Sequence, residues 1–249
     1  MFINDQQSGC KNIIPGLRGI PLWRTDEFPW IKELEQHSDT IKQELLLIFD
    51  GKQFKPNGLI LRALQQDIEQ SDQESEDLTD HFWNSYQLFS PVLDLTQEQL
   101  RIPKTTNILR SVIKNQKEKA AFSLSVEKFR QEPHHGDQNY ILRFVYPIMG
   151  GEGTQIKVGD EYKYYQEGQM FVVDDSFLHQ VIDEGDDVRI QLILDIWHPD
   201  LNDEEIKILE IMDRAFERLK LLQSFSYYQI PLNNELQELQ NRIDELDHN

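Results

Sequence analysis

Residues 167–201 read EGQMFVVDDSFLHQVIDEGDDVRIQLILDIWHPDL, and this stretch carries the clearest indication of a fold. It contains three short runs rich in β-branched and aromatic residues, at 169–175, 179–182 and 188–197. Four similar runs precede them, at 120–126, 140–148, 154–159 and 161–165. Gly- and Asp-rich turn sequences separate most of these runs, which is typical of short antiparallel strands. The region 120–200 is therefore predicted to be a sandwich or jelly roll.

Helical patterns lie on both sides of this β region. Before it, a segment at 14–30 rich in Pro, Gly and Trp leads into apolar residues at helical spacing over 29–49. Further features are a helix at 57–70, an acidic loop at 71–79, aromatic residues at 81–93 that should pack on the core, and a short helix at 104–113. After it, a helix is predicted over 203–222.

These predictions give one domain at 14–222, which suits a chain of 249 residues. Its expected parts are a helical N-terminal part at 14–119, a β core at 120–200 and the helix 203–222, with an N-terminal segment at 1–13 and a C-terminal helical tail at 223–249. In the tail, the gaps between apolar residues follow a heptad pattern, through Leu232, Leu236, Leu239, Ile243 and Leu246. Two heptads fit either packing on the domain or weak homodimerisation, so the chain is expected to be a monomer or a weak homodimer.

Charge and cysteine content exclude several classes of function. The chain has 25 basic and 44 acidic residues, so its net charge of −19 opposes binding to nucleic acid or to anionic membrane surfaces. No apolar run approaches the ~18 residues of a membrane helix, and the first residues do not form a signal peptide. Cys10 is the only cysteine, so a cytoplasmic location is expected. Nucleophile-elbow, phosphate-loop and HExxH motifs are absent from the sequence.

Two places in the β region carry histidines that could hold a metal. His134 and His135 stand at the head of one strand, and His179 stands at the head of another. Imidazoles from two strands suit iron, copper or zinc, although a strand histidine is more often only a hydrogen-bonded structural residue. Arg189 follows His179 by ten residues, and a buried arginine needs an anion such as a carboxylate cosubstrate.

The sequence pattern alone does not decide whether His134 or His135 faces the candidate site. Side chains two residues apart share a face of a strand, so His134 goes with Gly136 and His135 goes with Asp137. The second pairing would complete a His-x-Asp…His facial triad with His179, and a shift of one residue exchanges the two sets.

Three other polar residues near these strands are expected to be structural. Asp174 and Asp175 should order the turn before His179 and support its ring by hydrogen bonding. His198 lies past the last strand and beside a proline, which favours a structural role.

Several motifs resemble the aspartyl/asparaginyl β-hydroxylase family of iron(II)- and 2-oxoglutarate-dependent dioxygenases. They are AFSLS at 121–125, PHHGDQNYILRF at 133–144, EGQMFVVDDSFLHQV at 167–181 and VRIQLILDIWHPDL at 188–201. PGLRGIPLW at 15–23 also resembles the family's entry segment, and IPKTTNILRSV at 102–112 falls where the family has a proline-threonine turn and a short helix. The resemblance therefore covers roughly residues 14–215.

The resemblance implies a double-stranded β-helix, a jelly-roll or cupin-like fold, with N-terminal and C-terminal helices packed around it. It implies Fe(II) as cofactor, with 2-oxoglutarate and O2 as cosubstrates. It assigns His134 and His179 as the iron ligands. Arg189 and Ser123 would bind the distal carboxylate of 2-oxoglutarate, and Arg143 would bind near the other one. The resemblance also selects the register of His134 with Gly136, which leaves His135 beside the site or on its substrate side and makes Asp137 a turn residue.

Two departures affect what the resemblance implies. Gly136 stands where many oxygenases have a carboxylate ligand, and Val145 stands where the family often has a histidine. The expected function is a hydroxylase acting on an aspartyl, asparaginyl or similar polar residue, free or in a peptide. One alternative is a small-molecule halogenase that uses the same two-histidine site, because a missing carboxylate leaves room for a halide. The other alternative is a non-catalytic β-barrel that binds a partner.

Overall fold

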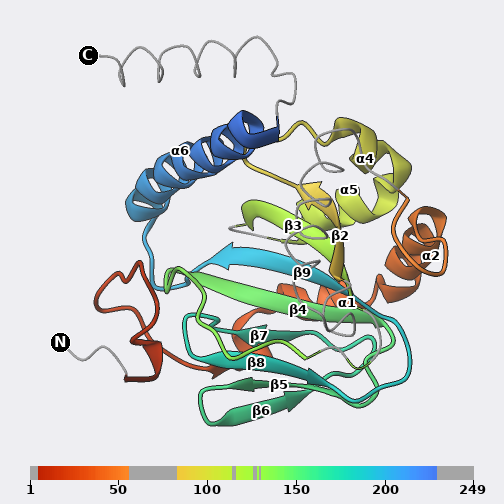
Figure 1. Cartoon of the computed structure of the whole chain (residues 1–249), viewed down its shortest axis with the longest axis horizontal. Helices are drawn as coiled ribbons and strands as arrows, with labels where there is room; N and C mark the ends of the chain where they lie inside the picture. The colour runs from red at the N-terminus through yellow and green to blue at the C-terminus, as the bar shows by residue number, and fades with distance from the viewer. Residues whose placement is uncertain (1–4, 56–82, 114–115, 126–127, 129, 229–249) are drawn as a thin grey trace.

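The fold is built from two antiparallel sheets. The computed structural model describes residues 5–55, 83–113, 116–125, 128 and 130–228 (Figure 1). The larger sheet has the order β1 (Leu22–Trp23), β7 (Phe171–Val173), β4 (Ile141–Met149), β9 (Arg189–Trp197), β3 (Gln116–Ser125) and β2 (Trp83–Phe89). The smaller sheet has the order β6 (Glu161–Tyr164), β5 (Thr154–Val158) and β8 (His179–Asp183). The arrangement is a double-stranded β-helix, which confirms the predicted fold class.

Burial along the strands explains why these residues form two layers. In β5 and β8, buried and half-buried residues alternate, so each strand turns one face toward the larger sheet. In β4 and β9, buried residues occupy both faces. A strand buried on both faces needs cover on both sides, which the smaller sheet and the helices provide.

Four short helices cover the outer face of the larger sheet. They are α1 (Trp30–Glu35), α2 (Ser38–Ile48), α4 (Thr96–Arg101) and α5 (Pro103–Val112). Their buried residues, among them Leu34, Leu45 and Leu109, form one core with the outward residues of the central strands. The buried Glu44 of α2 fixes α5, because its carboxylate accepts hydrogen bonds from the backbone N–H groups of Lys104 and Thr105. A carboxylate at a helix N-terminus satisfies donors that have no partner within the helix.

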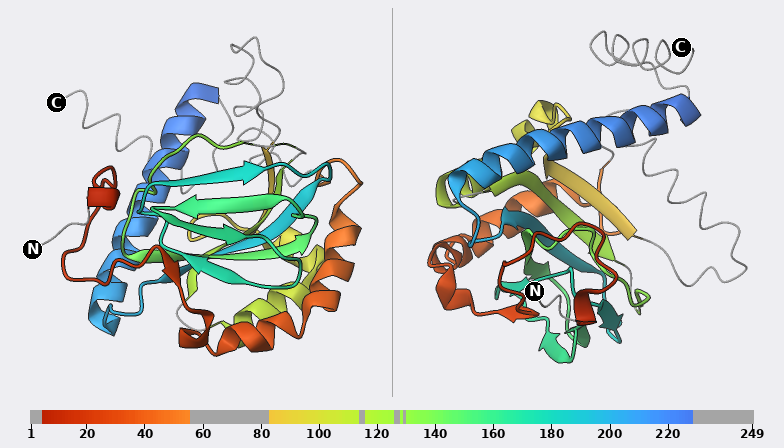
Figure 2. Two further views of the ribbon diagram at one scale, coloured as in Figure 1. Left: turned by 90° about the horizontal axis from the view of Figure 1, so that it is seen from below. Right: turned by 90° about the vertical axis from the view of Figure 1, so that its left-hand side faces the viewer.

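The last described helix, α6 (Asp203–Tyr228), lies on the opposite side of the sheets from α2 (Figure 2). Leu209 packs with Trp197 and Leu201 beneath it. Lys117 of β3 forms a buried ion pair with Asp213, at 2.8 Å. Among the described residues, no helix combines the length and the apolar character that crossing a bilayer requires.

The first described residues bind to the loop between β7 and β8. The Gln7 side chain donates to the Ser176 hydroxyl at 2.8 Å, and the Leu178 N–H donates to the Gln6 carbonyl at 2.9 Å. The N-terminal segment is therefore attached to the loop that leads into His179.

Most sequence-based elements are confirmed, and three differ. The seven β runs are strands, and the predicted helices at 104–113 and 203–222 correspond to α5 and α6. The predicted helix at 29–49 is two helices, with a break at residues 36–37. The aromatic run at 81–93 packs on the core as expected, but as strand β2 within the part predicted to be helical. Residues 22–23, expected to be irregular, form β1 and pair with β7. The predictions for 57–70, 71–79 and 232–246 lie outside the described residues.

Candidate functional site

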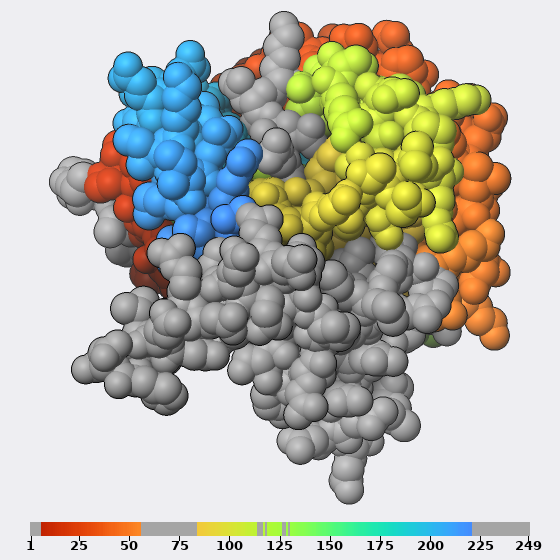
Figure 3. All heavy atoms as spheres, turned by 90° about the horizontal axis from the view of Figure 1, so that it is seen from above, coloured from red at the N-terminus to blue at the C-terminus, as the bar shows by residue number. Residues whose placement is uncertain are grey.

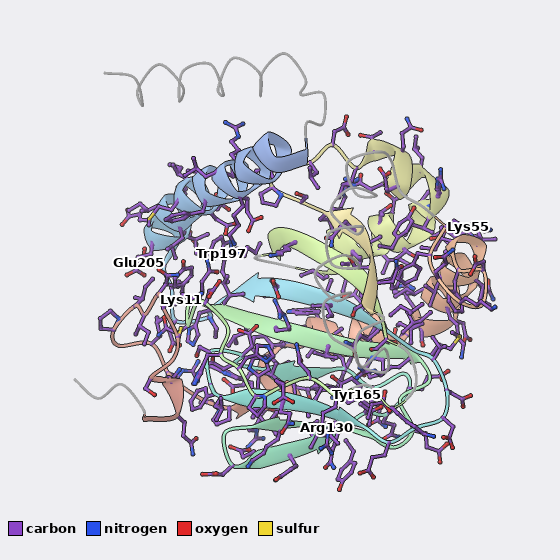
Figure 4. The ribbon with its side chains drawn as sticks, in the orientation of Figure 1. Lys11, Lys55, Arg130, Tyr165, Trp197 and Glu205 are labelled. Carbon is purple, nitrogen blue, oxygen red and sulfur yellow. The ribbon has the colours of Figure 1, made fainter. Side chains whose placement is uncertain are left out.

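A cavity of about 420 Å³ lies between the two sheets. Its lining comes from both sheets and from the segment at 130–134, and it contains Ser123, Ser125, Arg130, His134, Arg143, Val145, Tyr165, Asp175, His179, Arg189 and Gln191. Figure 4 labels Arg130 and Tyr165, which lie close together beside the strands of the smaller sheet. All five residues that the sequence assigned to metal or cosubstrate, Ser123, His134, Arg143, His179 and Arg189, line this one cavity.

His134 and His179 face each other across an isolated antiparallel bridge. The His134 N–H donates to the His179 carbonyl at 3.0 Å, and the His179 N–H donates back at 2.9 Å. The centroids of the two imidazole rings are 4.1 Å apart. Two residues that are 45 positions apart in sequence thus present their rings to the same part of the cavity.

The hydrogen bonds of the two rings define which nitrogens remain for a metal. Nδ1 of His134 lies 2.8 Å from the Glu132 carbonyl, and Nδ1 of His179 lies 3.0 Å from the Phe177 carbonyl. A carbonyl accepts only, so each Nδ1 carries a proton, and in the neutral form of each ring the lone pair is on Nε2. Burial lowers the pKa of His179, which favours the neutral ring that metal binding requires.

No carboxylate completes a facial triad in the described part of the chain. Within it, no group of three or more His, Cys, Asp or Glu side chains is arranged to hold a metal ion. A Cβ placed on Gly136 would lie 2.5 Å from Oδ1 of Asp175. The Asp175 carboxylate therefore occupies the space that a side chain at 136 would need.

His135 and Asp137 point away from the histidine pair. Nδ1 of His135 lies 2.9 Å from the Ser176 carbonyl, and its ring packs against Gly9. Asp137 forms an exposed ion pair with Lys11 at 2.8 Å. Of the two adjacent histidines, the structure places His134 in the cavity with His179. His135, Gly136 and Asp137 line a second, more polar cavity of about 250 Å³.

Arg189 has the features of an anion site. It is only 2% exposed, and its Nη2 donates to the Ser125 hydroxyl at 2.6 Å. The guanidinium lies 4.8 Å from the centre of the Tyr165 ring, and its Nε is 3.6 Å from the Asp183 carboxylate, too far for a hydrogen bond. Nε and Nη1 have no hydrogen-bond partner. A buried guanidinium with unused donors at a cavity wall can receive a carboxylate.

Two carboxylates bind the guanidinium of Arg143, so only part of its N–H donors is available to a ligand. Its Nε and Nη2 donate to Asp195 at 2.9 and 3.1 Å, and its Nη1 lies 3.0 Å from Asp175. Burial alone would raise the pKa of Asp195, but Arg143 outweighs it and holds that pKa below its usual value. Three of the five N–H groups of Arg143 are thus occupied, and two remain for a ligand.

Asp174 and His198 have structural roles near the metal-site candidates. Asp174 is buried and accepts hydrogen bonds from the Ser176 N–H and hydroxyl. Burial raises the pKa of Asp174 to about 7. His198 bonds to the Arg18 carbonyl through Nε2 and packs edge-on against Trp23, which agrees with its expected structural role.

Ser125 and Asp195 are polar partners that the sequence did not single out. Ser125 lies opposite Arg189 across β3 and β9, and Asp195 lies opposite Arg143 across β9 and β4. Only the register between strands reveals these pairs, so the sequence offers no local sign of them. Val145 contributes an apolar wall to the cavity.

A double-stranded β-helix with two facing histidines and a buried arginine in one cavity defines a cupin-type protein with a candidate metal site. The sequence profile of the family described as "Aspartyl/Asparaginyl beta-hydroxylase" matches residues 35–199, about two thirds of the chain. The chain belongs to this family. Membership supports a hydroxylase and is consistent with a metal cofactor.

Individual relatives agree with this assignment. The chain is 26% identical to human aspartyl/asparaginyl beta-hydroxylase over 203 residues, which are 79% of this chain and 25% of that protein. It is 33% identical over 96 residues to mouse aspartate beta-hydroxylase domain-containing protein 1, covering 37% of this chain and 27% of that protein. The chain therefore spans about a quarter of the length of these relatives.

Matches to solved structures are partial. A predicted oxalate decarboxylase from Thermotoga maritima overlays on 32% of this chain and 66% of its own, with 12% identity and a TM-score of 0.28. The fold assignment rests on the two sheets described above.

Proposed function

We propose that this protein is an iron(II)- and 2-oxoglutarate-dependent dioxygenase that hydroxylates an aspartyl, asparaginyl or similar polar residue, free or in a peptide. The observation that carries the proposal is a single cavity with two imidazole lone pairs and a buried guanidinium that has unused donors. Family membership gives the hydroxylase class, and these residues give the reason for the cofactor and cosubstrate.

The histidine pair fits an iron(II) ion. His134 and His179 would bind it through Nε2, since each Nδ1 is already bonded to a backbone carbonyl. Two protein ligands leave several coordination positions for cosubstrate and O2. When bound, the iron would activate O2, the oxidant, so that one oxygen atom converts a substrate C–H to C–OH and the other enters succinate as 2-oxoglutarate loses CO2.

The arginines fit the two ends of a dicarboxylate. Arg189 would bind the distal carboxylate through Nη1, supported by the hydroxyl of Ser125 and the neighbouring Ser123. Arg143 would act near the other carboxylate through its two remaining N–H groups, while Asp195 and Asp175 fix its position. Closing the cavity with a bound ligand would exclude water and strengthen these contacts.

The structure favours hydroxylation over the halogenase alternative. A halide bound where a carboxylate ligand is missing would have to lie on the Gly136 side of His134, and the Asp175 carboxylate is already there. A halide there would lie against a carboxylate that already pairs with Arg143 at 3.0 Å. A non-catalytic β-barrel would have no need for a buried arginine with unused donors.

We also propose a substrate class, a range of partners and a cellular location for the protein. A small molecule or a peptide is the proposed substrate. The net charge of −19 argues against nucleic acid and anionic membranes as partners, and the single cysteine suits the cytoplasm.

The direct test is succinate formation from 2-oxoglutarate by the purified protein, with and without added iron(II). We expect turnover that needs iron(II), is lost in His179→Ala and is retained in Leu178→Ala, a matched change at the adjacent exposed residue. Succinate formation that is unchanged in His179→Ala would refute the proposed metal site. Absence of any iron-dependent turnover, with a range of acidic peptides and amino acids supplied, would refute the dioxygenase.

A further inference from the structure

Residues 6–14, which we call the N-terminal strap, bind both segments that carry the candidate metal ligands. The strap contacts residues 174–178, directly before His179, and residues 135–139, directly after His134. Figure 3 shows the first described residues, in red, on the surface beside α6, in blue. The strap is therefore a third piece of chain at the place where the two ligand-bearing segments meet.

One peptide group connects the strap to the ring of His179. The Leu178 N–H donates to the Gln6 carbonyl at 2.9 Å. The Phe177 carbonyl lies 3.0 Å from Nδ1 of His179 and accepts its proton. The Phe177 carbonyl and the Leu178 N–H belong to one peptide unit, which is planar, so a bond that fixes the N–H also fixes the direction of the carbonyl. The strap thus helps to set the direction in which Nε2 of His179 points.

The side chain of Gln7 holds the strap on the loop before His179. It is only 7% exposed, and its Nε2 donates to the Ser176 hydroxyl at 2.8 Å. That hydroxyl donates in turn to the buried carboxyl of Asp174. A buried polar group that loses its partner is costly, so this contact opposes separation of the strap from the loop.

The other end of the strap binds the segment after His134. The Asn12 N–H and its side-chain amide both donate to the Asp137 carbonyl, at 2.9 and 3.0 Å. The buried side chain of Asn139 accepts from the Ile14 N–H at 2.7 Å and donates to the Ile14 carbonyl at 3.0 Å. Because it is bonded at both ends, the strap holds the two ligand-bearing segments in one arrangement.

We propose that the N-terminal strap is a positioning element for the metal site, and that a bound metal in return stabilises the docked strap. The inference rests on the proposed function, because it takes His134 and His179 as the metal ligands. A ring that is already oriented loses less freedom when the ion binds, so the strap raises metal affinity. Coupling between two sites is reciprocal, so the ion must also favour the docked strap.

The experiment measures the dissociation constant of Mn(II), an air-stable probe of iron(II) sites, by calorimetry. Gln7→Met keeps the length of the side chain and removes its amide. We expect it to bind Mn(II) about tenfold more weakly, as is typical when a group that orients a metal ligand is lost. Ser8→Ala is the matched control at the adjacent, exposed residue of the strap, and its affinity should stay within about twofold. A purely structural role of Gln7 would lower the thermal stability but leave the dissociation constant of the folded protein unchanged.

A second variant tests the contact between the strap and the segment after His134. A Cβ on Gly9 would lie 2.3 Å from Cδ2 of His135, whose ring is held by the Ser176 carbonyl at 2.9 Å. Gly9→Ala should therefore displace the strap and weaken Mn(II) binding. The double variant Gly9→Ala/His135→Ala should restore the affinity, because it removes the ring that the new Cβ would meet. A loss that persists in the double variant would contradict this geometry.

Hydrogen exchange supplies a readout that is independent of activity. In the wild type, Mn(II) should slow exchange of the Asn12 amide, which donates to the Asp137 carbonyl. A wild type that does not bind Mn(II) would overturn the metal site, and with it both the proposed function and this inference. A wild type that binds Mn(II) while Gln7→Met binds it equally well would overturn the inference alone. Exchange at Asn12 that the bound metal leaves unchanged would do the same.

Discussion

Replacing Arg189 by lysine should weaken 2-oxoglutarate binding without removing the positive charge. The guanidinium donates one Nη2 hydrogen to Ser125, and its unused Nη1 together with the second Nη2 hydrogen can give a carboxylate two parallel hydrogen bonds. A lysine has all three N–H groups on one atom and cannot form that fork. At 2% exposure, water cannot replace the missing bond.

The expected loss is that of one charge-assisted hydrogen bond. Such a bond contributes about 1.5–3 kcal/mol, so the dissociation constant for 2-oxoglutarate should rise roughly 10- to 150-fold. Calorimetry with the iron(II)-loaded protein in the absence of O2 measures this change directly. Arg130→Lys is the matched control, because Arg130 lines the same cavity but is exposed. Its dissociation constant should stay within about twofold, as expected for an exposed charge.

The assay also separates loss of binding from loss of folding. Arg189→Lys keeps a cation near Ser125 and Asp183, so its thermal unfolding should remain cooperative. An unchanged affinity in a folded Arg189→Lys variant would refute the argument and remove Arg189 from the cosubstrate site. An equal loss in Arg130→Lys would show that the effect is not specific to the buried fork of Arg189.

Three further predictions concern the metal and the loop beside it. His134→Ala and His179→Ala should each abolish iron-dependent consumption of 2-oxoglutarate while circular dichroism stays unchanged, and retained consumption in either would contradict the assignment. His135→Ala and Asp137→Ala should keep iron affinity, measured by titration under O2-free conditions, whereas losses as complete as in His179→Ala would favour the His-x-Asp register. Burial raises the pKa of Asp174 to about 7, so the folded state holds this proton more tightly than the unfolded state does. The protonated Asp174 carboxyl therefore contributes its full share to the free energy of unfolding below about pH 4. This contribution should be lost as pH rises through about 7. Urea unfolding at pH 5 and pH 8 should show this loss in the wild type and a smaller one in Asp174→Asn, and an equal loss in both would exclude Asp174 as its cause.

The strands of the β core were predictable because the alternation of buried and exposed residues is visible within each short stretch of sequence. A strand with one face inward must alternate in polarity, and turn residues must follow it, so β5 and β8 leave a clear pattern in the sequence. In strand β2 (Trp83–Phe89), residues 84–88 alternate between buried and half-buried, but the buried Asn84 is polar, so the alternation of polar and apolar residues in the sequence is short. Its strand character comes from pairing with β3, which no short window of sequence contains.

The sequence predicted only those residues of the candidate site that belong to recognisable motifs. The strand pattern indicated the His134–His135 pair, His179 and Arg189, and the family resemblance selected His134. The structure brings His134, His179 and Arg189 into one cavity. Ser125 and Asp195 depend on which residue faces which across β3, β9 and β4. Register is set by tertiary contacts, so these two partners were beyond the reach of the sequence.

The attachment of the N-terminal segment has a consequence for the order in which the protein assembles. Gln7 and Ser176 are 169 positions apart, and their hydrogen bond helps to hold the loop that ends at His179. Contacts between such distant positions close a long loop and tend to form late in folding. On a ribosome, the first residues must wait until the chain beyond Ser176 has emerged. We therefore expect the histidine pair to reach its final geometry after the two sheets have formed, so that the newly made protein folds before it can bind a metal.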